Sequence, residues 1–203
     1  MPGWQSIHQE LESEGFVVIT VAVDRADDAR SWIERANPTH PSLIDEHHRL
    51  GELYNMVNVP TVVWIDETGR ITRPNDVAFT TEKGGRYANV STDEQMALLR
   101  SWVRGQLPPP SDEEIRQRMA PLSDESRVAR AHFGLGWWLH QAGRQDAAQH
   151  QFQIGGELAP DDFMIRRGAM PLRGSDPFGP EFVEMVTDWL ALGHTYYLPL
   201  PVE

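Results

Sequence analysis

The chain has 203 residues, of which 40% are hydrophobic and 24% are charged, a composition that is typical of a folded globular protein and excludes a disordered one. No apolar stretch approaches the roughly 20 residues that a membrane-spanning helix needs, and a formal net charge of −12 disfavours binding to nucleic acid or to an anionic membrane surface. The sequence contains no cysteine, which excludes a disulfide framework, a thiolate metal site and a cysteine nucleophile within these residues.

The first part of the chain predicts a helix followed by a buried strand. Trp4, Ile7 and Leu11 recur at helical spacing, and Gly15 ends the segment. The run Phe16–Val23 is almost continuously apolar and rich in β-branched residues. Such a run is typical of a parallel strand covered on both faces, because a half-exposed strand would alternate apolar and polar residues.

Two more helices are expected before the next long strand. The first begins at Asp27 and Asp28, whose charges suit a helix N-terminus, and the second follows the short segment Ser42–Ile44. Their apolar stripes are Ala29, Trp32, Ile33 and Ala36 in the first, and Leu50, Leu53, Tyr54 and Val57 in the second. Tryptophans that fall on apolar stripes along the chain are predicted to be core residues: Trp4, Trp32, Trp102 and Trp189.

A strand–turn–strand pattern comes next. The strand Val62–Ile65 is followed by the turn signal Asp66–Gly69, and Arg70–Thr72 begins the returning strand. The polar, Gly-rich stretch 73–90 predicts a long loop with a short strand near Val77–Phe79. Capping-box candidates at Ser91 and Thr92 then open a helix that buries Met96, Leu99 and Val103 and stops at Gly105.

The second half of the sequence predicts only helices. Pro108–Pro110 marks a stiff linker, and Ser111 begins a short helix. From Ala129 to Pro160 the spacing resembles one tetratricopeptide (TPR) unit, in which Leu135, Leu139 and Phe152 would fill the gap between two helices. A single unit cannot bury its own apolar face, and the amphipathic segment from Pro180 to Gly193 could cover it.

The order of elements in the first half resembles the TlpA/ResA-like thiol–disulfide oxidoreductases, which have the thioredoxin fold. The residues that carry the likeness are Met1–Trp4, Val17–Asp24, Pro41–Asp45, Leu53-Tyr54 and Val59–Arg70. The resemblance implies that Pro60 follows a cis peptide bond and faces the redox motif. It also implies that Val59, Pro60 and Thr61 form the substrate-binding platform, with the N–H and C=O of Val59 left unpaired for a substrate strand.

The departure from the family lies at the front of the chain. Family members carry a strand, then Trp-Cys-x-x-Cys, then a helix with an early proline, and Pro2 resembles that proline. The missing motif would therefore lie upstream of Met1, and the chain is interpreted as a fragment of a longer reading frame. A selenocysteine codon read as a stop is one hypothesis for the break. The missing strand would be the central one, between Val17–Val23 and Val62–Ile65.

The predicted fold class is accordingly α/β. Residues 1–106 are expected to form a thioredoxin-like domain without its N-terminal strand and redox motif, residues 107–122 a Pro-rich linker and short helix, and residues 123–203 a small all-α, TPR-like domain. The resemblance implies a parent that exchanges thiols and disulfides, with protein thiols or a peptide as partner, and no catalytic residue in this chain, which is predicted to be inactive alone. Two alternatives stay open: a non-catalytic peptide- or protein-binding module, with a partner for the TPR-like region, and a fragment of a peroxiredoxin-like antioxidant enzyme.

No metal or cofactor site is predicted from the sequence. His47 and His48 are adjacent and point in different directions on a helix, and the histidines of the second half lack the i, i+4 spacing of a two-histidine metal site. There is no Gly-rich phosphate loop after a strand. The compartment stays open, with the cytoplasm as the default, because any export signal would lie upstream of Met1.

Overall fold

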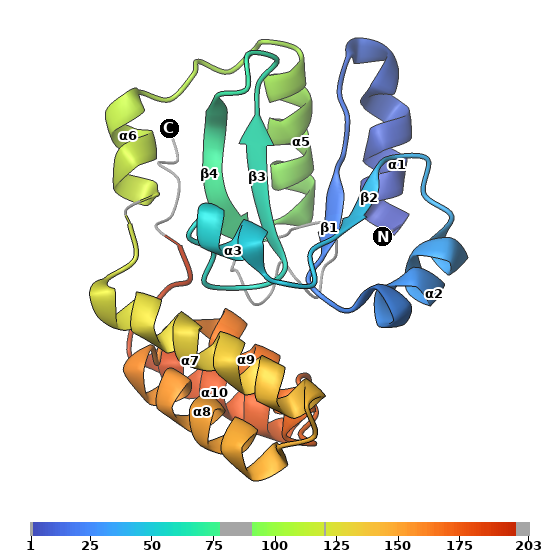
Figure 1. The fold of residues 1–203 in the computed structure, drawn as a ribbon. Helices are drawn as coiled ribbons and strands as arrows, with labels where there is room; N and C mark the ends of the chain where they lie inside the picture. The colour runs from blue at the N-terminus through green and yellow to red at the C-terminus, as the bar shows by residue number, and fades with distance from the viewer. Residues whose placement is uncertain (1, 78–90, 120, 198–203) are drawn as a thin grey trace.

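The chain folds into an α/β unit followed by a helical unit, which lie one above the other in Figure 1. The computed structural model describes residues 2–77, 91–119 and 121–197. In chain order its elements are α1 (Pro2–Leu11), the 3₁₀ helix η1 (Glu12–Glu14), β1 (Thr20–Ala22), α2 (Ala26–Ala36), β2 (Ser42–Ile44), α3 (Arg49–Leu53), β3 (Thr61–Ile65), β4 (Ile71–Val77), α5 (Thr92–Val103), α6 (Asp112–Arg118), α7 (Asp124–Gln141), α8 (Gln145–Leu158), α9 (Phe163–Leu172) and α10 (Pro180–Ala191).

The strands form two separate pairs. Parallel pairing joins β1 to β2, with Val21 opposite Leu43, and antiparallel pairing joins β3 to β4, with Thr61 opposite Val77. Within the described residues no ladder connects β1 to β3. The two strands that were expected to flank an absent central strand are thus present, and they are not hydrogen-bonded to each other.

One hydrophobic core nevertheless joins the two pairs. Val18, just before β1, and Trp64 of β3 bury their side chains together with Ile7 and Leu11 of α1 and Leu99 of α5. Charged side chains add a second connection, because Arg100 of α5 and Arg104, just after it, donate bidentate hydrogen bonds to Glu10 of α1 and Glu14 of η1. The helices α1 and α5 therefore hold the strand pairs in one layer despite the missing ladder.

The predicted doubly covered strand at Phe16–Val23 is wrong in its extent and its burial. β1 spans only Thr20–Ala22, and the preceding residues alternate: Val18 is buried, whereas Val17 and Ile19 are each more than half exposed. The apolar run could not show this, because its single polar residue, Thr20, does not set up an alternation that would mark the uncovered face. The returning strand is also longer than expected, since β4 extends to Val77; Phe79 lies outside the described residues.

The prediction of a buried Trp32 is wrong as well. Its side chain is 68% exposed and lies against the guanidinium of Arg35, 4.9 Å from the ring centroid. The other three tryptophans on predicted stripes pack as expected: Trp189 is buried, and Trp4 and Trp102 are partly buried against the core of the α/β unit.

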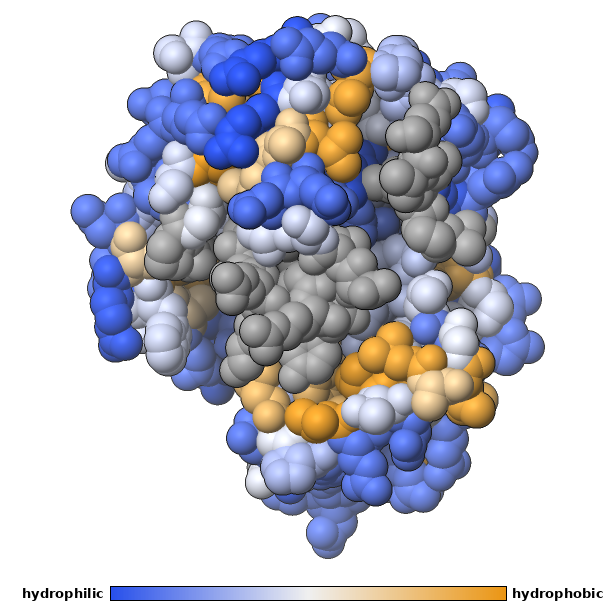
Figure 2. All heavy atoms as spheres, turned by 180° about the vertical axis from the view of Figure 1, so that it is seen from behind, coloured by the Kyte–Doolittle hydropathy of each residue, from blue (hydrophilic) through white to orange (hydrophobic). Residues whose placement is uncertain are grey.

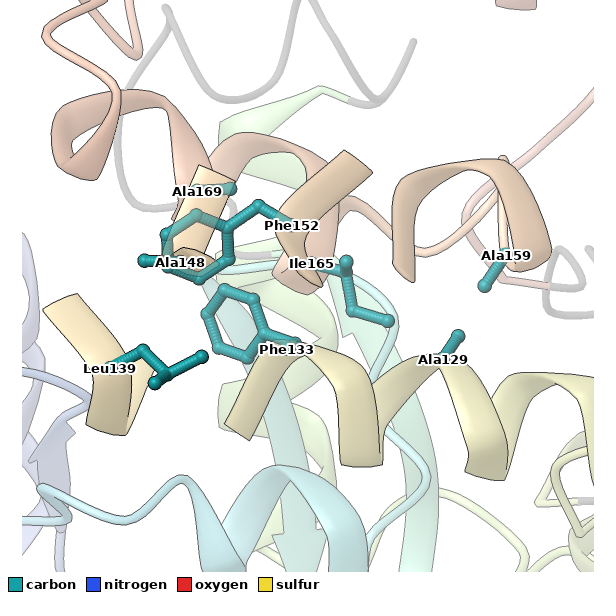
Figure 3. Packing of buried hydrophobic residues seen from close by; sticks show 8 residues of the cluster. All are labelled: Ala129, Phe133, Leu139, Ala148, Phe152, Ala159, Ile165 and Ala169. Carbon is teal, nitrogen blue, oxygen red and sulfur yellow. The ribbon is translucent and has the colours of Figure 1, made fainter. Parts of the chain in front are cut away.

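In the helical unit, α7 and α8 pack closely as a hairpin. Leu139 and Phe152 are buried between helices as predicted, and Figure 3 shows them with Phe133, Ala148 and their neighbours. Leu135 was expected beside them but is 46% exposed, because Phe133 occupies the interhelical position two residues earlier.

The remaining helices complete this unit. A second cluster joins α9 to α10 through Phe163, Met170, Phe182, Val186 and Trp189. The final amphipathic helix therefore covers α9, a helix that the sequence pattern did not distinguish. On the face opposite to that in Figure 1, apolar residues gather in the upper part of the α/β unit and in a band across the helical unit, with hydrophilic residues around them (Figure 2). Within the described residues, no helix is both long and apolar enough to cross a membrane.

Candidate functional site

The loop that precedes β3 contains the residues that the sequence singled out. The Val59–Pro60 peptide bond is cis, as predicted. Pro60 is exposed, Val59 and Thr61 are half-buried, and the Thr61 hydroxyl donates a 2.6 Å hydrogen bond to the carbonyl oxygen of Asn58. The three predicted residues thus lie together at the start of β3, on a loop that is tightly bonded within itself.

The helical unit holds this loop through α9. The backbone N–H groups of Phe163 and Met164 donate to the carbonyl oxygen of Val57, at 2.8 Å and 3.2 Å. One turn further along α9, Arg167 Nη1 donates to the carbonyl oxygen of Val59, at 2.9 Å. The expectation that this carbonyl is unpaired is therefore wrong. A contact across 108 residues of sequence could not be read from the local pattern.

Tyr197 holds the same loop from the C-terminal end of the described chain. Its hydroxyl oxygen accepts from the N–H groups of Val57 and Asn58, at 3.2 Å and 3.3 Å, and lies 2.6 Å from Thr61 Oγ1. Since the Thr61 hydroxyl donates to Asn58, the hydrogen between the two hydroxyls comes from Tyr197. The Tyr197 hydroxyl therefore donates one hydrogen bond and accepts two. Nothing in the sequence pattern indicated that Tyr197 would contact this loop.

A buried ion pair lies beneath the loop. Arg130 of α7 donates from Nε to Asp162 Oδ2 at 3.0 Å, and its two terminal nitrogens donate to the carbonyl oxygens of Gly51 and Met56. Asp162 also caps α9 by accepting from the N–H groups of Met164 and Ile165. Burial raises the pKa of Asp162 above its ordinary range, in spite of the opposing charge of Arg130.

Tyr197 provides a pH test of this arrangement. Burial raises its pKa to about 12, from the ordinary value of 10. Because the folded-state pKa lies above the unfolded value, its contribution to stability is complete below about pH 10 and is lost as the pH rises towards about 12. We expect a late phenolate step from Tyr197 in the ultraviolet absorbance. Tyr197→Phe should abolish that step and lower the free energy of unfolding by about 1–3 kcal/mol, since two N–H groups lose their acceptor. A late step that survives in the variant would contradict the assignment.

The loop holds no thiol that could act as the nucleophile of thiol–disulfide exchange, because the sequence contains no cysteine. Within the described residues there is no cluster of three or more His, Asp or Glu side chains suited to a metal ion. Val59 retains an N–H without a partner in the described part of the chain. That N–H lies next to the exposed Pro60.

The segment that contains the cis-proline loop is similar to a known protein family. Residues 1–73 match the AhpC/TSA family, a redoxin family of the thioredoxin-like class. The match runs from α1 into β4 and includes the cis-proline loop; the helical unit lies outside it. No curated protein and no solved structure is significantly similar to the chain.

Proposed function

We propose that this chain is the cis-proline half of a thiol–disulfide oxidoreductase of the redoxin class, of TlpA/ResA type, whose reactive thiol or selenol is supplied by a strand that pairs between β1 and β3. One observation carries the proposal: Val18, just before β1, and Trp64 of β3 pack in one core, yet among the described residues no strand is hydrogen-bonded to both β1 and β3. The match of residues 1–73 to a redoxin family supports the same class of chemistry.

Backbone energetics favour a strand as the missing piece. The inner edges of β1 and β3 each present N–H and C=O groups, and each such group that stays buried without a partner costs about 1–3 kcal/mol. A strand between them would satisfy both edges at once if it ran parallel to β1 and antiparallel to β3, because β1 and β3 point in opposite directions (Figure 1). The side chains of Val17 and Ile19, now exposed, lie in the segment that leads into the open edge of β1.

The chemistry of the completed site is a two-electron exchange. A thiolate or selenolate on the added strand would attack a substrate disulfide and release one substrate thiol, and a neighbouring thiol would then displace the second. The substrate gains two electrons and two protons, and the protein pair is oxidised to a disulfide or selenenylsulfide. Val59, Pro60 and Thr61 would hold the substrate backbone beside the reacting atoms.

Two other functions are supported by particular observations. The AhpC/TSA match favours a thiol peroxidase, in which a hydroperoxide replaces the disulfide as oxidant. The hydrogen bond from Arg167 to Val59 favours a non-catalytic binding module, because half of the platform is already occupied by the protein's own helical unit. That unit would then be a TPR-like surface for a protein partner.

The proposal can be tested in two steps. The genomic sequence before codon 1 is read in frame, and the extended chain is then expressed. We expect a strand-forming segment with a cysteine codon, alone or beside UGA, and an extended protein that reduces insulin disulfides while residues 1–203 alone do not. Serine at the added cysteine or selenocysteine is the matched control and should be inactive. Consumption of hydroperoxide without disulfide reduction would select the peroxidase instead. A well-folded extended chain that is inert in both assays would leave the binding module.

A further inference from the structure

A pocket of about 210 Å³ lies where α3 meets α7, and its lining includes Arg130 and Met164, which also contact the loop before β3. Aromatic side chains of α7 form one wall, from Phe133, Trp137 and Trp138, and Glu46, His48 and Glu52 line the side next to α3. Its volume exceeds the roughly 150 Å³ of a cavity that accommodates benzene. The pocket can therefore hold a group of about that size or slightly larger.

The aromatic wall is built around His48. Its imidazole stands edge-on to Phe133, with centroids 5.5 Å apart, and to Trp137, with centroids 5.6 Å apart. Burial lowers the pKa of His48 below its ordinary value, so the ring is neutral at pH 7. Trp138 is 60% exposed although it lines the same pocket. The exposed ring of Trp138 therefore leaves part of the aromatic wall in contact with water, where a ligand in the pocket could cover it.

The charges around the pocket are predominantly negative. Glu46 and Glu52 line it, and Asp24 and Asp45 lie near enough to act on His48. The lining cation Arg130 does not offset them, because its guanidinium is committed to Asp162 and to two backbone carbonyls. The chain as a whole carries a formal charge of −12, which adds a long-range attraction for cations.

We propose that this pocket binds a compact organic cation, an alkylammonium or guanidinium group. Tryptophan faces are the best aromatic partners for such a cation, and a carboxylate at the rim supplies the opposing charge. The group could belong to a small molecule or to a basic side chain on a peptide, and both present the same chemistry to Trp137, Trp138 and Glu52. The proposal is independent of the thiol chemistry and of the missing strand.

The cation-binding proposal can be tested by titration calorimetry on the full 203-residue chain. Tryptophan fluorescence gives a second measurement of the same binding. The probes are choline and ethylguanidinium, and the matched neutral probe is 3,3-dimethylbutan-1-ol, which has the shape of choline without its charge. We expect saturable binding of at least one cation and roughly ten-fold weaker binding of the neutral alcohol. An acetylated and amidated Gly-Arg-Gly peptide that binds tighter than ethylguanidinium would identify a protein side chain as the source; equal or weaker binding would identify a small molecule.

Two pairs of variants locate the binding. Glu52→Gln should weaken cation binding several-fold, whereas Glu67→Gln, the same change at an exposed turn residue outside the pocket, should not. Trp138→Leu should weaken it about ten-fold, with Trp32→Leu as the control for loss of an exposed tryptophan. The proposal is overturned if neither cation binds saturably, if the neutral alcohol binds as tightly, or if Glu52→Gln and Trp138→Leu leave the affinity unchanged.

Discussion

Replacing Arg130 by methionine is expected to destabilise the protein by about 3–5 kcal/mol, the usual cost of removing one partner from a buried ion pair. Asp162 is only 3% exposed, and its carboxyl group would lose the guanidinium that now faces it. The carbonyl oxygens of Gly51 and Met56 would lose a donor at the same time. Because these contacts join α7 to the cis-proline loop, thermal and denaturant unfolding should both report the loss.

The pH dependence identifies the cause. Without Arg130 the pKa of Asp162 should rise further above its unfolded value, so the destabilisation should be largest near neutral pH and shrink as acid protonates Asp162 in both states. Adding Asp162→Asn to the variant should restore part of the stability. Arg104→Met, which breaks an exposed pair with Glu14, is the control and should have a much smaller effect. An equal loss in both arginine variants at every pH would refute the buried-charge explanation.

Placing a methyl group at Gly136 is the second change with a large expected effect. A Cβ there would lie 2.6 Å from Cε1 and 2.7 Å from Cδ1 of Phe152, whose ring is buried and packs against Phe133. Gly136→Ala should therefore lower the free energy of unfolding by about 2 kcal/mol, within the range for overpacked cores. Chemical denaturation measures this loss of stability. An unchanged m-value would show that the variant exposes the same surface area on unfolding.

Gly134 supplies the matched control on the same helix. A Cβ at Gly134 meets no atom within 4 Å, so Gly134→Ala should stabilise α7 by about 0.5–1 kcal/mol through the higher helix propensity of alanine. The two substitutions are chemically identical and two residues apart, yet should have opposite signs. Stabilisation by both would show that α7 and α8 do not cross as closely as Figure 3 depicts.

The sequence predicted local features better than contacts between distant segments. The cis bond before Pro60 and the interhelical positions of Leu139 and Phe152 were foreseen, because each depends on a short pattern of residues. The burial of Trp32 and Leu135 was not predicted correctly, since an apolar stripe shows that a helix is amphipathic but not which of its apolar residues the neighbour covers.

The candidate site shows the same limit more sharply. Val59, Pro60 and Thr61 could be chosen from their motif, but the side chains that hold them come from far along the chain. Arg167 and Tyr197 contact this loop across 108 and up to 140 residues of sequence, and neither belongs to a recognisable motif. Only the folded arrangement of α9 and the segment after α10 brings them there.

The bonds from α9 and Tyr197 have a practical consequence for dissecting this protein. A shortened chain that stops at the proline triplet would retain every residue of the redoxin-like segment and yet lose the anchors on Val57 and Val59. Its loop would be free to relax, and its affinity for an extended peptide would describe the shortened chain only. The C-terminal half should therefore be kept in any experiment on the cis-proline loop, because it supplies the hydrogen bonds that hold that loop.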